Sequence, residues 1–253
     1  MLLDWQAMEL NLKGKRALVT GGSKGIGWAS ACALADEGCE VMVAARNPPA
    51  GGRFRFRATD LSQRGTAEAL SEWAGDLDIL VNNAGAIPGG DLLRVDEDTW
   101  RRAWDLKMFG YLNLTRQVYA RMKARKAGVI VNILGNAGEK LDASYIAGST
   151  ANAGLMAFTR TLGGASHADG VRVVGINPGP VATDRLKSLF RQRAEAKFGD
   201  PERYPELFAG MSFGRPASPE EIAWAVAFLA SERSAYTTGC ILSIDGGLAS
   251  RST

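Results

Sequence analysis

Short apolar segments and longer amphipathic segments alternate along the chain, and their order predicts the fold. Apolar runs too short for helices lie at residues 17–19, 40–45, 77–81, 129–133, 171–176 and 241–244. Residues 54–58 alternate between apolar side chains and arginine, which is typical of a strand with one solvated face. Helical spacing follows Gly27 and covers residues 62–74, 99–125 and 144–166, and a last helix begins at Pro219. This alternation predicts an α/β fold, a doubly wound parallel β-sheet forming a single domain over residues 1–253.

A glycine-rich segment joins the first predicted strand to the first helix. It runs from Lys15 to Gly27 and reads Lys-Arg-Ala-Leu-Val-Thr-Gly-Gly-Ser-Lys-Gly-Ile-Gly. Glycines allow the chain to turn sharply and to approach a ligand without a Cβ atom in the way. The helix that follows presents free N–H groups and the positive end of its dipole, which favour a phosphate. Strand, glycine turn and helix together predict a dinucleotide pyrophosphate site of the Rossmann type.

Composition excludes several other classes of protein. The 253 residues are 46% hydrophobic and 23% charged, as in an ordinary globular domain, and the net charge of +3 is too small to indicate nucleic-acid binding. No apolar run is long enough to span a membrane, and Met1 to Gln6 lack the pattern of a signal peptide. Cys32, Cys39 and Cys240 show no metal-ligand or redox spacing. We therefore expect a cytoplasmic protein with reduced cysteines, no metal and no membrane partner.

The spacing Thr-Gly-x-x-x-Gly-x-Gly from Thr20 to Gly27 resembles that of the short-chain dehydrogenase/reductase family. Further matching segments follow in the family's order over nearly the whole chain: Asp60-Leu61, Asn83-Ala84-Gly85, Pro178-Gly179 with Thr183, Gly214-Arg215-Pro216, Phe228-Leu229-Ala230-Ser231, Thr238-Gly239 and Asp245-Gly246-Gly247. The resemblance implies an oxidoreductase that transfers a hydride between a nicotinamide cofactor and a carbonyl or secondary alcohol. It also implies cofactor contacts from Gly21, Ser23, Lys24, Gly25, Ile26, Gly27, Arg46, Asp60, Leu61, Asn83, Ala84, Gly85, Pro178, Gly179, Val181 and Thr183.

Charge at the end of the second predicted strand favours NADP(H) over NAD(H). An acidic residue there would bind the ribose hydroxyls of NAD and repel a 2′-phosphate. The strand instead ends in Ala44, Ala45 and Arg46, and Lys24 lies in the glycine loop. The guanidinium of arginine matches the geometry of a phosphate, so Arg46 and Lys24 are candidate ligands of the 2′-phosphate. The alternative is that both are solvated surface charges.

The catalytic residues that the resemblance implies are only partly present. Family members carry a serine, a tyrosine, a lysine four residues after the tyrosine, and an asparagine in the preceding long helix. Tyr145 is in the expected place as proton donor and acceptor, but Ser149 replaces the lysine, Gly135 the serine and Lys107 the asparagine. A phenol with a pKa of about 10 needs a nearby cation, because an ammonium about 4 Å away contributes roughly 4 kcal/mol at an effective dielectric of 20.

Two interpretations of this changed set remain. In the first, Lys107 extends into the space left by the shorter Ser149 and supports Tyr145, while Asn136 offers a hydrogen bond to the substrate in place of the serine. The protein is then an oxidoreductase with reduced or altered activity. In the second, the site is catalytically impaired, and the protein binds a dinucleotide or another ligand as a sensor or scaffold.

The segment from Thr183 to Phe213 lies where the family has its variable substrate cover. Leu186, Leu189 and Phe190 form an apolar stripe with five cations and one acid around it. We expect a mainly apolar small-molecule substrate, with an acidic or phosphate-bearing compound as the more specific form; a solvated amphipathic helix is the plainer alternative. The resemblance also implies a homotetramer or dimer, formed through the helices over 99–125 and 144–166 and the C-terminal strand. Aromatic and sulfur side chains available for such contacts are Trp100, Trp104, Phe109, Tyr111, Met156 and Phe158.

Overall fold

Parallel strands form one continuous sheet in the computed structural model, which describes residues 9–251. The seven strands in this part of the chain are β1 (Arg16–Thr20), β2 (Glu40–Ala45), β3 (Arg55–Ala58), β4 (Ile79–Asn82), β5 (Gly128–Ile133), β6 (Val171–Pro178) and β7 (Ile241–Ile244). They lie in the order β3-β2-β1-β4-β5-β6-β7, and every neighbouring pair is parallel. The predicted fold class is therefore confirmed. The stretch Met1 to Gln6 and the outermost ends of the predicted domain lie outside the described residues.

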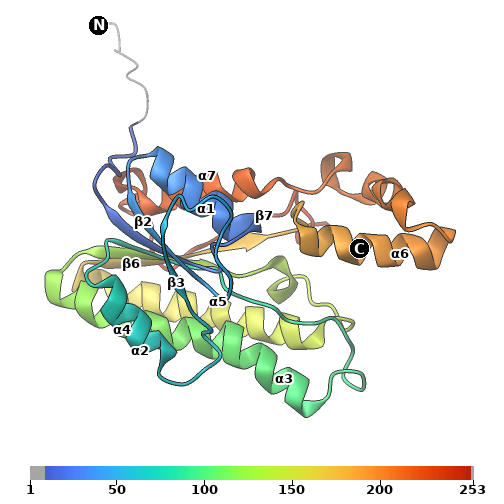
Figure 1. Cartoon of the computed structure of the whole chain (residues 1–253), viewed down its shortest axis with the longest axis horizontal. Helices are drawn as coiled ribbons and strands as arrows, with labels where there is room; N and C mark the ends of the chain where they lie inside the picture. The colour runs from blue at the N-terminus through green and yellow to red at the C-terminus, as the bar shows by residue number, and fades with distance from the viewer. Residues whose placement is uncertain (1–8, 252–253) are drawn as a thin grey trace, which may run out of the picture.

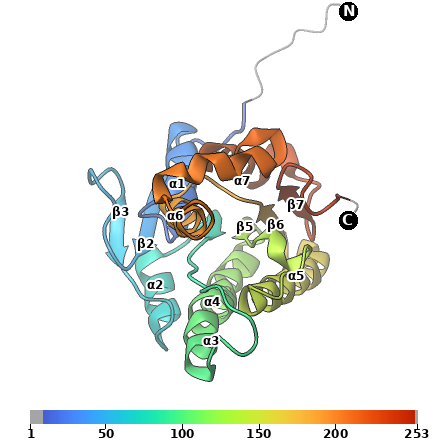
Figure 2. The same ribbon diagram turned by 90° about the vertical axis from the view of Figure 1, so that its right-hand side faces the viewer.

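Helices cover both faces of the sheet (Figures 1 and 2). One face carries α1 (Gly25–Asp36) and α7 (Pro219–Ala230), and the other carries α2 (Thr66–Ala74), α4 (Gly110–Arg125) and α5 (Ile146–Ser166). Alternate side chains of β1 enter the two cores: Val19 packs with the first group of helices and Leu18 with the second. Both are fully buried, so the central strand is apolar on its two faces, as expected of a parallel sheet between helices.

The strand order places a binding edge at the centre of the sheet. The chain runs outward from β1 to β2 and β3, then returns to place β4 on the other side of β1. At such a switch point the loops after neighbouring strands diverge and leave a crevice at the carboxyl ends. Helix α6 (Asp184–Phe198) follows β6 and projects beyond this edge of the sheet (Figure 1).

Two helices differ from the sequence prediction. The helix expected over residues 99–125 begins at Glu97 and consists of α3 (Glu97–Trp104), a π-helical turn η1 (Asp105–Phe109) and α4. The inserted turn changes the direction of the side chains that it carries, Lys107 among them. The helix expected from Ser62 begins only at Thr66, because the Asp60 carboxylate accepts hydrogen bonds from the Ser62 N–H and hydroxyl and holds a turn there.

The substrate cover predicted from Thr183 to Phe213 is helical throughout most of its length. Thr183 caps α6, and the 3₁₀ segments η4 (Pro201–Gly210) and η5 (Ser212–Gly214) follow it. Phe190 on α6 packs against Phe208 on η4, with ring centroids 5.5 Å apart. Three shorter 3₁₀ turns complete the described elements: η2 (Asn136–Gly138), η3 (His167–Asp169) and η6 (Glu232–Ser234). None of the helices within residues 9–251 has the length and apolar character needed to cross a membrane.

Candidate active site

A cavity of about 520 Å³ lies at the carboxyl edge of the sheet, over the switch point between β1 and β4. Its walls are the glycine loop after β1, the ends of β2, β4, β5 and β6, the start of α5 and the first turns of α6. Segments far apart in the sequence therefore contribute to one space; Figure 2 shows the arrangement of these elements from the side where α6 extends. Its position and size suit a dinucleotide together with a small substrate.

The glycine loop is held against the end of β4 by Asn83. The Asn83 side-chain amide donates to the carbonyl oxygens of Thr20 and Gly21, at 3.0 and 3.2 Å, while the Thr20 hydroxyl accepts from the backbone N–H of Asn83 and Ala84. Gly21 has a φ of 64°, and a Cβ atom there would lie 2.9 Å from the Ala84 Cα. Only glycine therefore allows the loop to pass so close to β4.

The N-terminus of α1 can receive an anion. Lys24 is the residue that precedes the helix, and its side chain makes no capping hydrogen bond. The backbone N–H groups of the first turn thus lack the side-chain acceptor that usually satisfies them. The residues present fit the pyrophosphate of a dinucleotide, because free donors, the helix dipole and a bare glycine backbone meet at one wall of the cavity.

Most of the predicted cofactor residues line the cavity. They are Gly21, Ser23, Lys24, Gly25, Ile26, Arg46, Leu61, Asn83, Ala84, Gly85, Pro178, Gly179, Val181 and Thr183. The other two have different surroundings. A side chain at Gly27 would overlap the Gly21 carbonyl and the Asn83 amide, so this glycine allows the loop to close. The Asp60 carboxylate is engaged with Ser62. Cofactor contacts of all these residues, Gly27 and Asp60 included, stay predictions.

Tyr145 lines the cavity from the first residue before α5. Its backbone is held by the loop after β4, because Gly90 accepts a hydrogen bond from the Ile146 N–H and donates one to the Ser144 carbonyl. The ring of Tyr145 lies over Gly148, where a Cβ atom would overlap ring atoms Cε1 and Cζ. Gly148 therefore leaves the space in which the tyrosine ring rests.

Lys107 also lines the cavity, from the π-helical turn. Its Nζ donates to the Leu134 carbonyl at 2.6 Å, just beyond the end of β5, and its carbon chain packs over Gly85. Burial, with a smaller contribution from the positive charge of Arg185, lowers the pKa of Lys107 from 10.5 to about 7. The ammonium can thus lose its proton near neutral pH. Lys107 thus lies in the same cavity as Tyr145, and its support of the tyrosine stays a prediction.

The other two predicted catalytic residues lie in different surroundings. Asn136 lines the cavity at the start of η2. Ser149 is buried, and its hydroxyl accepts from the Asp142 N–H at 3.1 Å and donates to the Asp142 carbonyl at 3.3 Å. The serine thus fastens the loop before Tyr145, and it is absent from the cavity lining in the described part of the chain. A catalytic role for either residue stays a prediction.

Two cavity residues were missed among the predicted site residues. Asn152 lies two helical turns after Tyr145, is 3% exposed, and has an Oδ1 atom without a hydrogen-bond partner in residues 9–251. Its Nδ2 lies 2.8 Å from where a Cβ of residue 135 would be, so the amide fills the space left by Gly135. Arg185 on α6 donates to the Ile87 carbonyl at 2.5 Å and to the Tyr145 hydroxyl at 3.4 Å. Asn152 could have been found in the sequence from its position seven residues after Tyr145, which places both on one helix face. For Arg185 the sequence offered only the positive charge of the predicted cover.

Comparison with known proteins agrees with this architecture. A family model described as short chain dehydrogenase matches residues 15–194, which include the glycine loop, Lys107 and Tyr145. The chain belongs to the short-chain dehydrogenase family. The resemblance seen in the sequence is thereby confirmed.

Relatives of this short-chain dehydrogenase carry the names of reductases and dehydrogenases. The 3-oxoacyl-[acyl-carrier-protein] reductase of Vibrio cholerae is 34% identical over 257 residues, which cover 94% of this chain and 99% of the relative. The cis-4-hydroxycyclohexanecarboxylate dehydrogenase of Sinomonas cyclohexanicum is 35% identical over 249 residues, covering 91% and 95%. The crystal structure of L-sorbose reductase from Gluconobacter frateurii, complexed with NADPH and L-sorbose, superposes with a TM-score of 0.87 at 29% identity and covers 97% of this chain and 100% of its own.

Proposed function

We propose that this protein is an NADP(H)-linked oxidoreductase that interconverts a carbonyl compound and a secondary alcohol through Tyr145. The observation that carries the proposal is the meeting of the glycine loop, Tyr145 and Lys107 in one cavity at the switch point of the sheet. The names of the relatives support oxidoreduction and give no support to the alternative of a catalytically impaired sensor or scaffold.

The side chains of the cavity divide the chemistry between them. A bound nicotinamide cofactor supplies or accepts the hydride. Tyr145 donates its phenolic proton to the substrate oxygen during reduction and takes a proton from the alcohol during oxidation. Lys107 in its ammonium form stabilises the tyrosinate and, through its own pKa of about 7, can exchange a proton with it. Asn136 holds the substrate oxygen by a hydrogen bond in place of the family's serine.

The preference for NADP(H) rests on two cations that line the cavity. Arg46 follows Ala44 and Ala45 at the end of β2, and Lys24 lies in the glycine loop before α1. Cations lining the cavity favour a 2′-phosphate, and the carboxyl end of β2, at Ala44 and Ala45, carries no acid to repel it. The variant Arg46→Asp should weaken NADPH binding at least tenfold and change NADH binding little, as measured by fluorescence titration. A preference of the parent for NADH would contradict this part of the proposal.

The experiment that tests oxidoreduction is NADPH oxidation with a broad panel of carbonyl compounds. The parent should turn over at least one of them, and Tyr145→Phe should lose most of that activity while it binds NADPH like the parent. A Tyr145→Phe variant that retains the parental rate would show that the proton comes from another group. Binding of NADPH without turnover of any compound would instead favour the alternative that the protein is a catalytically impaired sensor or scaffold.

Assembly and location belong to the same proposal. We infer a homo-oligomer, a dimer or tetramer, since large apolar side chains remain exposed on α7 and β7 as well as at Phe109. We also infer a cytoplasmic location, because Cys32, Cys39 and Cys240 are free thiols.

A further inference from the structure

The geometry points to Arg185 as the residue that binds the carboxylate of an oxo-acid substrate. We propose that the substrate is a 2-oxo or 3-oxo acid, or the matching hydroxy acid, in which the carboxylate lies one or two carbons from the reacting carbonyl. This inference rests on the proposed function, because Tyr145 marks the place of the reacting oxygen. It goes further by giving the chemical class of the substrate.

Arg185 is anchored at the reacting end of the cavity. It lies in the first turn of α6, and its Nη2 donates to the Ile87 carbonyl at 2.5 Å and to the Tyr145 hydroxyl at 3.4 Å. The Ile87 carbonyl belongs to the loop after β4, so the guanidinium spans from the cover to the sheet. Its known partners are neutral oxygens, which leave the positive charge of the guanidinium uncompensated.

The charges around Arg185 favour an anion. The charged residues that line the cavity in the described part of the chain are Lys24, Arg46, Lys107, Arg185 and Asp184. Four cations thus share the cavity with the single acid Asp184, and the Arg185 side chain reaches the Tyr145 hydroxyl. Within residues 9–251 no ion pair joins Arg185 or Asp184 to another side chain.

Lys107 and Arg185, which line the same cavity, repel each other. The charge of Arg185 is one of the causes that lower the pKa of Lys107. Two cations close together in a partly desolvated space repel each other, and a carboxylate between them would relieve the repulsion. The two cations therefore favour the binding of an anionic substrate over that of a neutral ketone.

The distance between Arg185 and Tyr145 limits where the carboxylate can be on the substrate. A carbonyl oxygen that accepts from Tyr145 and a carboxylate oxygen that accepts from Arg185 each lie about 3 Å from their donors. The donors themselves are 3.4 Å apart. The two substrate oxygens can therefore lie at most about 9 Å apart, and the short separation in 2-oxo and 3-oxo acids lets both donors bind from the same side of the cavity.

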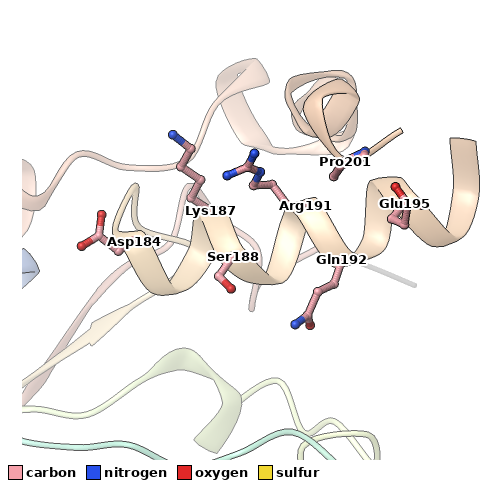
Figure 3. A pocket seen from close by; sticks show the side chains of 7 residues that line it. All are labelled: Asp184, Lys187, Ser188, Arg191, Gln192, Glu195 and Pro201. Carbon is pink, nitrogen blue, oxygen red and sulfur yellow. The ribbon is translucent and has the colours of Figure 1, made fainter. Parts of the chain in front are cut away.

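The same helix provides a matched control. Lys187 lies two residues after Arg185 and lines a separate groove on the outer side of α6, where Figure 3 shows it next to Arg191. Its ammonium lies 5.8 Å from the centre of the Tyr204 ring. Lys187→Gln removes one positive charge from α6 outside the cavity, whereas Arg185→Gln removes one at the reacting end.

The experiment compares three substrates of equal carbon number. They are 2-oxohexanoate, 5-oxohexanoate and 2-hexanone, assayed with NADPH for the parent, Arg185→Gln and Lys187→Gln. The parent should have a kcat/KM for 2-oxohexanoate at least tenfold above those for the other two. Arg185→Gln should abolish that advantage, with a loss of kcat/KM for 2-oxohexanoate at least tenfold larger than its loss for 2-hexanone, while Lys187→Gln should resemble the parent.

A binding measurement separates the two proposals. Oxamate, an unreactive analogue of a 2-oxo acid, is titrated calorimetrically into each protein in complex with NADPH. Binding that is at least tenfold weaker in Arg185→Gln than in Lys187→Gln would support the carboxylate site even if no compound were turned over, an outcome in which only the proposed reaction would fail. Unchanged oxamate binding, or an equal loss of activity with all three substrates in Arg185→Gln, would overturn the role of Arg185 in substrate recognition.

Discussion

At the scale of single residues, Lys107 is the least usual feature of the cavity. A lysine that supports a tyrosinate is expected to keep its proton at pH 7, yet burial lowers the pKa of Lys107 to about 7. If the ammonium form supports Tyr145, kcat/KM for NADPH-dependent reduction should fall as the pH rises through 7. Lys107→Met should be slower at pH 6 and should lack this inflection. A variant with the parental pH profile would show that Lys107 takes no part.

The pKa of Lys107 can be checked without catalysis. The unfolded lysine binds a proton below about pH 10.5 and the folded one only below about pH 7, so between these values the unfolded chain holds the additional proton. Raising the pH through this window should therefore stabilise the folded state, by a few kcal/mol at most. Urea unfolding of the parent and of Lys107→Met at pH 7 and pH 9.5 measures this. The free energy of unfolding should increase less between pH 7 and pH 9.5 in the variant than in the parent. An equal increase would show that the pKa of Lys107 is not lowered in the folded protein.

Asn152 is a buried polar residue that is expected to lower stability and to serve function. Its buried Oδ1 lacks a partner in the described residues, and such an orphan acceptor costs about 1–3 kcal/mol. Replacement by leucine, which is similar in size, should leave the melting temperature unchanged or raise it. If the amide contacts substrate or cofactor, kcat/KM should fall at least tenfold in Asn152→Leu. A variant that is both less stable and fully active would show that the amide serves the fold alone.

At the scale of elements, α5 begins directly after Tyr145 and carries the glycine that leaves room for the tyrosine ring. A Cβ atom at Gly148 would overlap the Tyr145 ring, whereas one at Gly164 on the same helix would meet no atom within 4 Å. Alanine is favoured over glycine in a helix by about 1 kcal/mol, so Gly164→Ala should raise stability and keep activity. Gly148→Ala should keep the fold but displace the ring and lower kcat at least tenfold. Equal activity of the two variants would show that the ring position does not matter.

The elements of the sheet were predictable because their signals are local. The apolar runs at residues 40–45 and 129–133 are bounded by turn residues, and the glycine loop has a fixed spacing, so these parts followed from the sequence. The π-helical turn at Asp105–Phe109 was not predictable, because it depends on how the helix packs and not on its periodicity. That turn governs the direction of Lys107, so the geometry of the site was less predictable than the fold.

Tertiary contacts account for the site residues that the sequence did not indicate. The position of the Asn152 amide depends on Gly135, which lies seventeen positions away in the chain and leaves room for that amide. Arg185 could be recognised as a cation of the cover, but its hydrogen bond to Tyr145 joins residues from different elements. Ser149 was assigned to the site from its spacing alone, while the structure engages its hydroxyl with Asp142. Spacing along a helix identifies a face, and only packing decides what that face contacts.

At the scale of the whole molecule, the exposure of large apolar side chains distinguishes core residues from residues that could contact another subunit. Of the residues considered for subunit contacts, Tyr111 and Met156 are buried in the core, whereas Phe109 is 48% exposed. Leu242, which is 41% exposed, lies on β7 at the edge of the sheet. An unpaired edge strand with an apolar side chain is open to association, so the C-terminal strand stays a candidate contact as the resemblance implies.

The assembly can be tested with charges placed at these two positions. Phe109→Glu and Leu242→Glu should each lower the particle mass, measured by light scattering, from a dimer or tetramer toward the 27.0 kDa of one chain, because a buried unpaired carboxylate opposes association. Phe213→Glu is the matched control, since Phe213 is 88% exposed but lies on the substrate cover. It should leave the mass unchanged. Dissociation by Phe213→Glu alone would place the subunit contact on the cover, and a parent of 27.0 kDa would contradict the proposed homo-oligomer.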